Sequence, residues 1–169
     1  MIDFNKDVMP LQDKFYRLAL RLLRNDAEAQ DVTQETLIRL WTRRNQLAST
    51  TDAEALGLTI SLNLSRDALT RAGRNYEQID NLDEDLLPDN SSNAIDNLAA
   101  NDRRNFVHKI IDRLPPKQKA LVQLRDIEGK SYREIAEIMQ LSEEQVKVTL
   151  FRARQSLKDA CQKLNRNGL

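Results

Sequence analysis

Apolar positions in the first half of the chain recur at the spacing of amphipathic helices. Between residues 10 and 24 they fall four, seven and eight positions apart, which places them on one face of a helix. An Asn-Asp-Ala-Glu sequence resembling a capping box predicts the start of a second helix over residues 25–43. A third helix is expected from residue 51 or 52 to Gly73, since glycine is favoured just past a helix C-terminus.

The third predicted helix is apolar on two opposite sides. One side carries Leu56, Ile60 and Leu64, and the other carries Leu58, Leu62 and Leu69. A polar strip between the two sides consists of Thr59, Asn63, Arg66 and Thr70. Because a helix that is apolar on both faces is normally buried on both, we expect it at the centre of a small bundle, with the polar strip as its accessible edge.

The helical pattern is interrupted in the middle of the chain. Residues 75–101 contain no Lys or Arg, many acids and a Pro-Asp-Asn-Ser-Ser-Asn stretch, a composition typical of a flexible tether. Beyond it, one helix ends at Pro115-Pro116 and the next runs to Gly129. The predicted fold is therefore all-α, with a helical bundle over 1–74, a flexible acidic linker over 75–101 and a second helical domain over 102–169.

Two capping boxes of the form Ser-x-x-Glu/Gln follow, at residues 131–134 and 142–145. Each N-cap contributes about 1 kcal/mol to its helix. They define a short helix, a turn at about Gln140-Leu141 and a longer helix from Glu143 to about Leu164. This arrangement predicts a helix-turn-helix near the C-terminus.

Composition agrees with this fold and excludes several classes of protein. Only 4 Gly and 4 Pro among 40% apolar residues favour long helices. No secretory leader and no run of 18 apolar residues is found, so we expect a cytoplasmic protein without membrane insertion. His108 is expected at the surface and Cys161 in the core. One His and one Cys leave no metal cluster, nucleophile–base pair or cofactor motif, so no enzyme activity, cofactor or metal is predicted.

The charges are unevenly distributed along the chain. The 26 basic and 26 acidic residues give a formal net charge of zero, but residues 1–74 carry +1, residues 75–102 carry −8 and residues 103–169 carry +7. Such asymmetry between segments indicates either nucleic-acid contact or an acidic tether. A formal net charge of zero therefore does not exclude DNA binding.

The functional prediction rests on the two faces of the last predicted helix. An inner apolar stripe is formed by Val146, Leu150, Ala153, Leu157, Cys161 and Leu164. The outward face places Val148 and Phe151 beside Lys147 and Arg152. This mixture suits major-groove reading, in which cations meet guanine edges or phosphates and apolar groups meet thymine methyls. The alternative is that Phe151 packs against its own domain.

Lys130 and Arg133, at the start of the short helix, are predicted phosphate contacts, with ordinary solvated charge as the alternative. The complete predicted DNA-contacting set of this domain is Lys130, Arg133, Glu144, Lys147, Val148, Phe151 and Arg152.

Three stretches, in order and spanning nearly the whole chain, resemble the extracytoplasmic-function (ECF) sigma factors. They are Asp-Val-Thr-Gln-Glu-Thr-Leu-Ile-Arg-Leu-Trp at 31–41, Leu-Pro-Pro-Lys-Gln at 114–118 and Val-Lys-Val-Thr-Leu-Phe-Arg-Ala-Arg at 146–154, with the acidic tether after the first. The resemblance implies a protein that binds bacterial RNA polymerase core enzyme and directs it to promoter DNA. It adds an anti-sigma factor to the candidate partners, and the free protein is expected to be a monomer.

The resemblance also implies roles for particular residues. Those implied to bind the clamp helices of the polymerase's largest subunit are Asp31, Gln34, Glu35, Leu37, Arg39 and Trp41. The alternative for Leu37 and Trp41 is plain bundle core. Those implied to hold the melted downstream promoter element are Asn63, Arg66, Arg71 and Arg74. Those on the family's base-reading positions for the upstream element are Lys147, Val148, Phe151 and Arg152. The acidic linker is implied to occupy the polymerase's basic RNA path, with simple solubility as the alternative.

Several positions depart from the family's pattern. Leu56 replaces an aromatic residue, and Gly57 beside it costs about 1 kcal/mol of helix propensity. Gln140 stands at a turn position where glycine is common, which requires a left-handed backbone. Val148-Thr149 stand where Ser and Arg are common, which implies more methyl contact and fewer guanine contacts with the upstream element.

A second function remains open at this point. The chain could be an ordinary helix-turn-helix transcriptional regulator with an N-terminal dimerisation or sensing domain. Such a regulator binds duplex DNA by itself, whereas a sigma factor is expected to show little specific binding until core polymerase is added.

Overall fold

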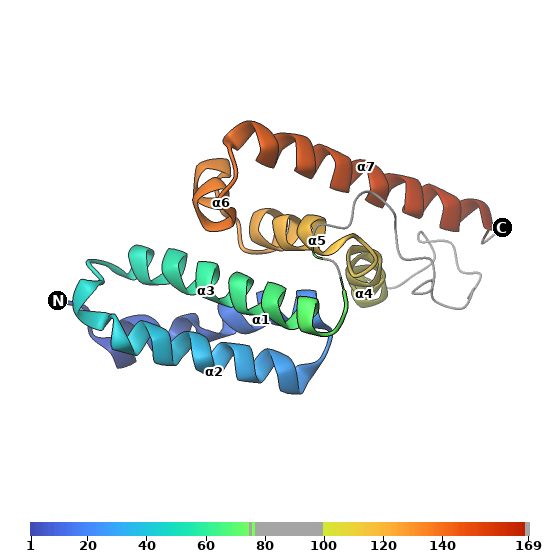
Figure 1. Ribbon diagram of the computed structural model, residues 1–169. Helices are drawn as coiled ribbons and strands as arrows, with labels where there is room; N and C mark the ends of the chain where they lie inside the picture. The colour runs from blue at the N-terminus through green and yellow to red at the C-terminus, as the bar shows by residue number, and fades with distance from the viewer. Residues whose placement is uncertain (75, 77–99, 168–169) are drawn as a thin grey trace.

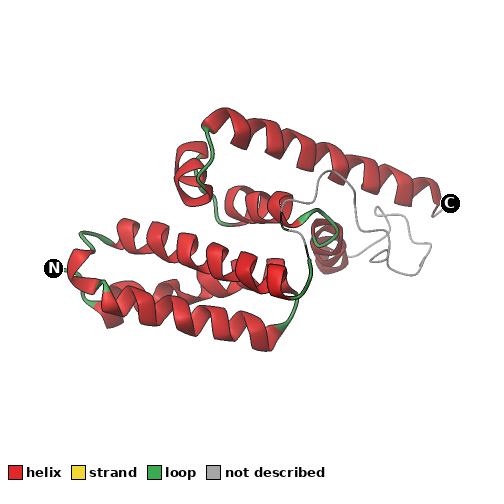
Figure 2. Cartoon of the chain, viewed as in Figure 1, coloured by secondary structure: helices red, strands yellow, loops and turns green. Residues whose placement is uncertain are grey.

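The computed structural model describes residues 1–74, 76 and 100–167, and every regular element within these ranges is a helix. Figure 1 shows two groups of helices, α1 (Gln12–Leu23) to α3 (Thr50–Arg71) and α4 (Ala100–Ile111) to α7 (Glu143–Asn167). Figure 2 shows that short loops connect the helices within each group. The predicted all-α fold is confirmed, whereas most of the predicted linker, residues 75 and 77–99, lies outside the described residues.

The N-terminal group is a three-helix bundle preceded by short turns. Its elements are η1 (Phe4–Val8), η2 (Met9–Leu11), α1, α2 (Asp26–Thr42), η3 (Arg44–Gln46) and α3. The predicted cap of the second helix is confirmed, because the Asn25 side chain accepts a hydrogen bond from the Glu28 amide at 3.0 Å. The first α-helix begins two residues later than predicted, since Pro10 lies in a tighter 3-10 turn.

Helix α3 lies between α1 and α2 on one side and α6 (Tyr132–Met139) on the other. Leu58, Leu62 and Leu69 are buried, and Ile60 on the opposite side is buried as well. Asn63 on the polar strip is exposed. Leu56 and Leu64 beside Ile60 are only half-buried. On the polar strip Thr70 is exposed too, whereas Thr59 and Arg66 are half-buried. The prediction of a helix buried on two sides with one accessible polar edge is therefore confirmed in part. Gly73 follows the helix with φ of +77°, as its predicted position past the C-terminus requires.

Gly57 marks a close approach between α3 and α1. A Cβ atom at this position would lie 2.2 Å from Cζ of Phe15, whose side chain is completely buried. One turn later, the Ser61 hydroxyl donates a hydrogen bond to the Phe15 carbonyl oxygen at 2.9 Å, which ties the same two helices together. The helix propensity lost at Gly57 is therefore offset by a contact that only a residue without a side chain allows.

Replacing Gly57 by alanine should lower the free energy of unfolding by about 1–3 kcal/mol, the usual effect of overpacking a core. Alanine's helix propensity, better by about 1 kcal/mol, opposes this loss. Urea denaturation followed by circular dichroism measures the change. The same substitution made on a Phe15→Leu background should lower the free energy of unfolding by less, because the smaller leucine side chain leaves room for the added Cβ atom. A higher urea midpoint for Gly57→Ala alone would show that the Phe15 ring moves aside freely.

The C-terminal group contains the predicted helix-turn-helix. Its elements are α4, α5 (Pro116–Val122), η6 (Gln123–Ile127), α6 and α7. The second capping box is reciprocal: the Ser142 side chain accepts from the Gln145 amide at 3.1 Å, and the Gln145 side chain accepts from the Ser142 amide at 2.9 Å. Gln140 in the turn has φ of 56° and ψ of 47°, the predicted left-handed conformation. The helix expected up to Gly129 instead ends at Val122 and continues as a wider π turn.

The inner face of α7 packs as the predicted apolar stripe over its first part, whereas Leu157 further along is half-buried. Val146, Leu150 and Ala153 are buried against the rest of the C-terminal group. Cys161 is half-buried rather than in the core, because the buried position in that turn is taken by Ala160. Burial still raises the pKa of the Cys161 thiol above its ordinary value, which disfavours the reactive thiolate. The side chain of Leu164 lies outside the described part of the chain.

Candidate nucleic-acid interface

The outward face of α7 exposes large apolar side chains among cations. The Phe151 side chain is 70% exposed, and Val148 is exposed as well, while their neighbours Val146 and Leu150 are buried. Lys147 and Arg152 flank them and are also exposed. The alternative in which Phe151 packs against its own domain is therefore wrong for the part of the chain that the structure describes. A protruding helix with an apolar and cationic face has the chemistry that major-groove readers use.

The Tyr132 ring contacts cations at the edge of this face. The Lys147 ammonium lies 5.8 Å from the centroid of the Tyr132 ring, and the Arg125 guanidinium lies 4.6 Å from it. Arg125 also donates a hydrogen bond to the Lys130 carbonyl oxygen at 2.8 Å. The aromatic ring thus fixes cations from two elements by cation–π contact. The sequence prediction missed Tyr132 and Arg125, although an aromatic residue directly after a helix cap was a visible signal.

The two predicted phosphate contacts are in different environments. Arg133 is well exposed, and its Nε lies 3.9 Å from Glu137 one turn along the same helix. The Lys130 side chain is only 14% exposed, and its ammonium lies 2.8 Å from Oε2 of Glu54 on α3. Lys130 is therefore engaged by the N-terminal group, whereas Arg133 faces solvent.

A second exposed surface lies on α2. The Trp41 side chain is 50% exposed, and Ile38 beside it is exposed too, so the bundle-core alternative for Trp41 is wrong. Trp41 is held in place by an edge contact with Phe4, with centroids 5.0 Å apart, and by the Arg44 guanidinium 3.9 Å above its ring. Phe4, Ile38 and Arg44 were missed. The contact between Phe4 and Trp41 depends on how the N-terminal turns fold back on α2, which the sequence does not specify.

The other residues predicted on α2 lie on the same helix, N-terminal to this tryptophan. Asp31, Gln34 and Arg39 are exposed, and Leu37 is half-buried against the bundle core. Arg39 donates from Nε to Oε1 of Glu35 at 3.0 Å, one turn away on the same helix. The face therefore combines protruding apolar groups with a rim of both charges.

The cations predicted on and after α3 lie at and beyond its C-terminal part. Arg71 and Arg74 are exposed, as is Asn63 further back along the helix. The Arg66 guanidinium lies 4.5 Å from the centroid of the Tyr76 ring, which is buried. Tyr76 was missed by the sequence prediction because it follows the helix and falls in the acidic stretch.

His108 is half-buried at the boundary between the two helical groups, and the prediction of a surface residue is wrong. Its Nδ1 accepts a hydrogen bond from Nη2 of Arg21 on α1 at 2.6 Å. Burial and then the charge of Arg21 lower the pKa of the His108 imidazole below its ordinary value, which favours the neutral ring that this contact requires. The ring packs there because α1 and α4 meet at this boundary.

Within the described ranges, no helix is long and apolar enough to cross a membrane. In the same part of the chain, no group of three or more His, Cys, Asp or Glu side chains is placed to hold a metal ion.

Comparison with known proteins gives matches along most of the chain. The model of Sigma-70 region 2 matches residues 8–75, and the model of Sigma-70 region 4 matches residues 106–157. An ECF RNA polymerase sigma factor, SigE of Mycolicibacterium smegmatis, is 35% identical over 147 residues, which is 87% of this chain but only 57% of that protein. The RNA polymerase sigma-E factor of Streptomyces avermitilis is 30% identical over 94% of this chain and 85% of its own length.

A solved structure has a similar fold. It is the sigma factor RpoE in complex with the anti-sigma factor NepR from Bartonella quintana, with a TM-score of 0.67, 21% identity and coverage of 93% of this chain and 95% of that one. Two helical groups, each matching one sigma-70 region, define a two-region sigma-70-type protein. Within that class, the chain belongs to the ECF RNA polymerase sigma factors.

Proposed function

We propose that this chain binds RNA polymerase core enzyme and directs it to promoters, where it takes part in promoter recognition and the initiation of transcription. The observation that carries the proposal is the pair of exposed apolar surfaces, Ile38 with Trp41 on one helical group and Val148 with Phe151 on the other. Exposed patches of this kind mark interaction sites. One surface has the chemistry of a protein-docking face and the other that of a groove-reading face.

The α2 surface is proposed to dock on the polymerase. Aromatic side chains at the centre of a contact supply most of its binding energy, and Trp41 is fixed by Phe4 and Arg44 before any partner arrives. The charged rim is proposed to set orientation. Its members, with the half-buried leucine between them, are Asp31, Gln34, Glu35, Leu37 and Arg39.

The DNA-contacting roles are divided between the two groups. On α7, Lys147 and Arg152 are proposed to meet guanine edges or phosphates, and Val148 and Phe151 the methyl groups of thymine. Glu144 suits acceptance of a hydrogen bond from a cytosine amine, and Arg133 suits a phosphate contact. On and after α3, the residues proposed to hold melted downstream DNA are Asn63, Arg66, Arg71 and Arg74.

Further features of the proposal follow from family membership. Residues 1–74 and 102–169 are proposed as the two functional domains, joined by the acidic linker 75–101. The chain is proposed to act without catalysis or cofactor, as a monomer in the cytoplasm. Because RpoE of Bartonella quintana forms a complex with the anti-sigma factor NepR, a partner of that kind is proposed for this chain as well.

Trp41→Ala is expected to weaken binding to purified core polymerase about thirtyfold, since truncating a central aromatic anchor typically costs 2 kcal/mol or more. Titration of the full-length chain with core enzyme in a mobility or fluorescence assay measures this change. The control is Val107→Ala, which shortens an exposed apolar side chain on α4 and should leave core binding unchanged. Equal losses for both variants, or failure of the unaltered chain to bind core, would contradict the proposed function.

A further inference from the structure

The N-terminal turn η1 is closed by two carboxylates. The Asp3 side chain accepts a hydrogen bond from the Lys6 amide at 3.2 Å, and the Asp7 side chain accepts one from the Asp3 amide at 2.8 Å. This reciprocal pattern resembles a capping box, which satisfies backbone donors at the start of a helix. Val8, at the end of the turn, is completely buried, and the turn packs against α3. Hydrogen bonds and core packing therefore fix η1 to the bundle.

Phe4 connects this turn to Trp41 on α2. The two ring centroids are 5.0 Å apart and the ring planes differ by 86°, an edge-to-face contact. Such a contact stabilises an aromatic pair beyond the area that it buries. Phe4 is half-buried and packs against the bundle core, whereas the Trp41 side chain is exposed. A ring anchored in the core thus supports a ring that protrudes from the surface.

Arg44, in the turn η3 after α2, contacts the same tryptophan twice. Its guanidinium lies 3.9 Å from the centroid of the indole ring. Its Nη1 also donates a hydrogen bond to the Trp41 carbonyl oxygen at 2.8 Å. The cation–π contact covers one face of the indole, and the hydrogen bond fixes the guanidinium to the end of α2. Phe4 and Arg44 therefore restrain the indole from two elements that lie on either side of α2 in the sequence.

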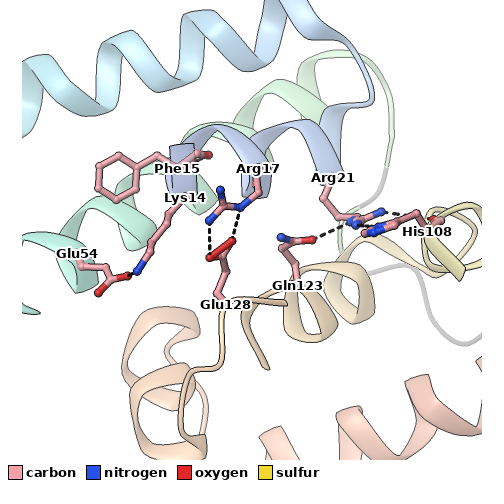
Figure 3. Close-up of polar contacts among 9 residues, drawn as sticks. Lys14, Phe15, Arg17, Arg21, Glu54, His108, Gln123 and Glu128 are labelled. Atoms are coloured by element: carbon pink, nitrogen blue, oxygen red, sulfur yellow. Dashed lines mark hydrogen bonds and ion pairs between the residues drawn. The ribbon is translucent and has the colours of Figure 1, made fainter. Parts of the chain in front are cut away.

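This aromatic cluster is separate from the polar contacts between the two helical groups. Those contacts start on α1, and Figure 3 shows Arg17 and Arg21 pointing from α1 toward the other group. Neither Phe4 nor Arg44 takes part in the hydrogen bonds drawn there. Substitutions at Phe4 and Arg44 therefore test the α2 surface without altering those contacts.

A protruding side chain that is already ordered loses little freedom when a partner binds it. Ordering a free side chain at an interface weakens binding by about two- to tenfold. We propose that Phe4 and Arg44 are positioning residues for docking on RNA polymerase core enzyme, which hold the Trp41 indole in the orientation that the polymerase binds. This inference rests on the docking role proposed above for the α2 surface. It adds the N-terminal turn to the docking machinery, although Phe4 acts only through Trp41.

The first test measures the motion of the indole in the free, full-length chain. Trp41 is the one tryptophan in the sequence, so intrinsic fluorescence reports on this side chain alone. Time-resolved fluorescence anisotropy follows its nanosecond motion. Phe4→Leu keeps an apolar side chain but removes the aromatic edge, and Arg44→Lys keeps the charge but removes the planar guanidinium. Both variants should increase the fast component of the anisotropy decay.

Two further variants make this measurement specific. Phe4→Tyr keeps the aromatic edge and should leave the decay as in the unaltered chain. Phe106→Leu makes the same change as Phe4→Leu at a half-buried phenylalanine on α4, and it should not affect the indole. Because η3 has no buried residue, Arg44→Lys keeps the inference testable even if Phe4→Leu loosens the bundle.

The second test measures the affinity of the same variants for purified core polymerase. Phe4→Leu and Arg44→Lys should each weaken binding about fivefold. This is less than the loss expected for Trp41→Ala, because the anchor itself remains. On a Trp41→Ala background, Phe4→Leu should cause no further loss, since it acts through a ring that is no longer there. Phe4→Tyr and Phe106→Leu should bind core as the unaltered chain does.

Three results would overturn the inference. The first is an unchanged anisotropy decay in Phe4→Leu and Arg44→Lys, and the second is a faster decay with unchanged core binding. The third is an equal loss from Phe4→Leu with and without Trp41, which would show that Phe4 contacts the polymerase directly. If the unaltered chain binds core and Trp41→Ala weakens that binding, the proposed function stands in all three cases, so the two failures are distinguished.

Discussion

Arg152→Glu is expected to lower promoter-dependent transcription about a hundredfold while the chain stays folded. Arg152 is exposed on the outward face of α7 beside Phe151, and its substitution disturbs no buried contact of the helix. Loss of one good contact to a base costs about 1–3 kcal/mol, and a carboxylate placed against the phosphates adds repulsion. A total of about 3 kcal/mol corresponds to a factor of roughly one hundred.

The matched control is Lys158→Glu, which makes the same charge change on the same helix two turns further along, also at an exposed position. Run-off transcription with core enzyme measures both variants. We expect Lys158→Glu to lower transcription only severalfold, because it weakens the general electrostatic attraction to DNA without altering the outward face of α7. An unchanged transcript yield with Arg152→Glu would show that Arg152 makes no contact with promoter DNA. Equal losses for the two variants would show that the change in net charge alone lowers transcription.

Lys119→Met is expected to raise the free energy of unfolding at pH 7 by about 2–3 kcal/mol. Lys119 lies on α5 and is only 4% exposed. Burial lowers its pKa from 10.5 to about 8; Asp112 opposes the shift, and the charges of Arg24 and Arg74 add to it. The charged ammonium is thus disfavoured in the folded chain, and an unbranched apolar side chain of similar length avoids that penalty.

The sign of the pH dependence follows from the lowered pKa. Between pH 8 and the ordinary pKa of 10.5, the unfolded chain binds more protons at this lysine than the folded chain does, so its contribution to stability rises with pH. The advantage of Lys119→Met should therefore shrink as the pH is raised from 7.5 to 10. Chemical denaturation at a series of pH values measures it, with Lys158→Met as the exposed control. A gain that stays constant with pH would come from methionine packing and not from the lost charge.

The helix-turn-helix could be predicted in detail because its determinants are local. Ser131 and Ser142 each cap a helix within three residues, and the 3.6-residue periodicity of α7 separates Val146 from Phe151 whatever else the chain does. The exposure of Phe151 followed directly from that periodicity. Gly57 was predicted as a weak point of α3, but the reason for it, the Phe15 ring, required knowing how two helices cross.

The contacts between the two groups were beyond sequence reasoning. Arg21 and His108 are separated by 87 positions, and His108 carries no local signal of its partner. Lys130 was predicted as a phosphate contact, and nothing nearby in the sequence indicates its partner Glu54. Pairing between distant charges depends on the relative placement of α1, α3, η6 and α6, which neither propensity nor periodicity specifies.

Transcription reconstituted from purified components tests the central claim most directly. Core RNA polymerase, this chain and a genomic template library are combined, and transcript 5′ ends are mapped with and without the chain. The account predicts discrete start sites that require both proteins and share upstream and downstream sequence elements. Specific binding of the chain alone to palindromic duplex DNA, with no new start sites when core enzyme is added, would contradict it and identify an ordinary helix-turn-helix regulator.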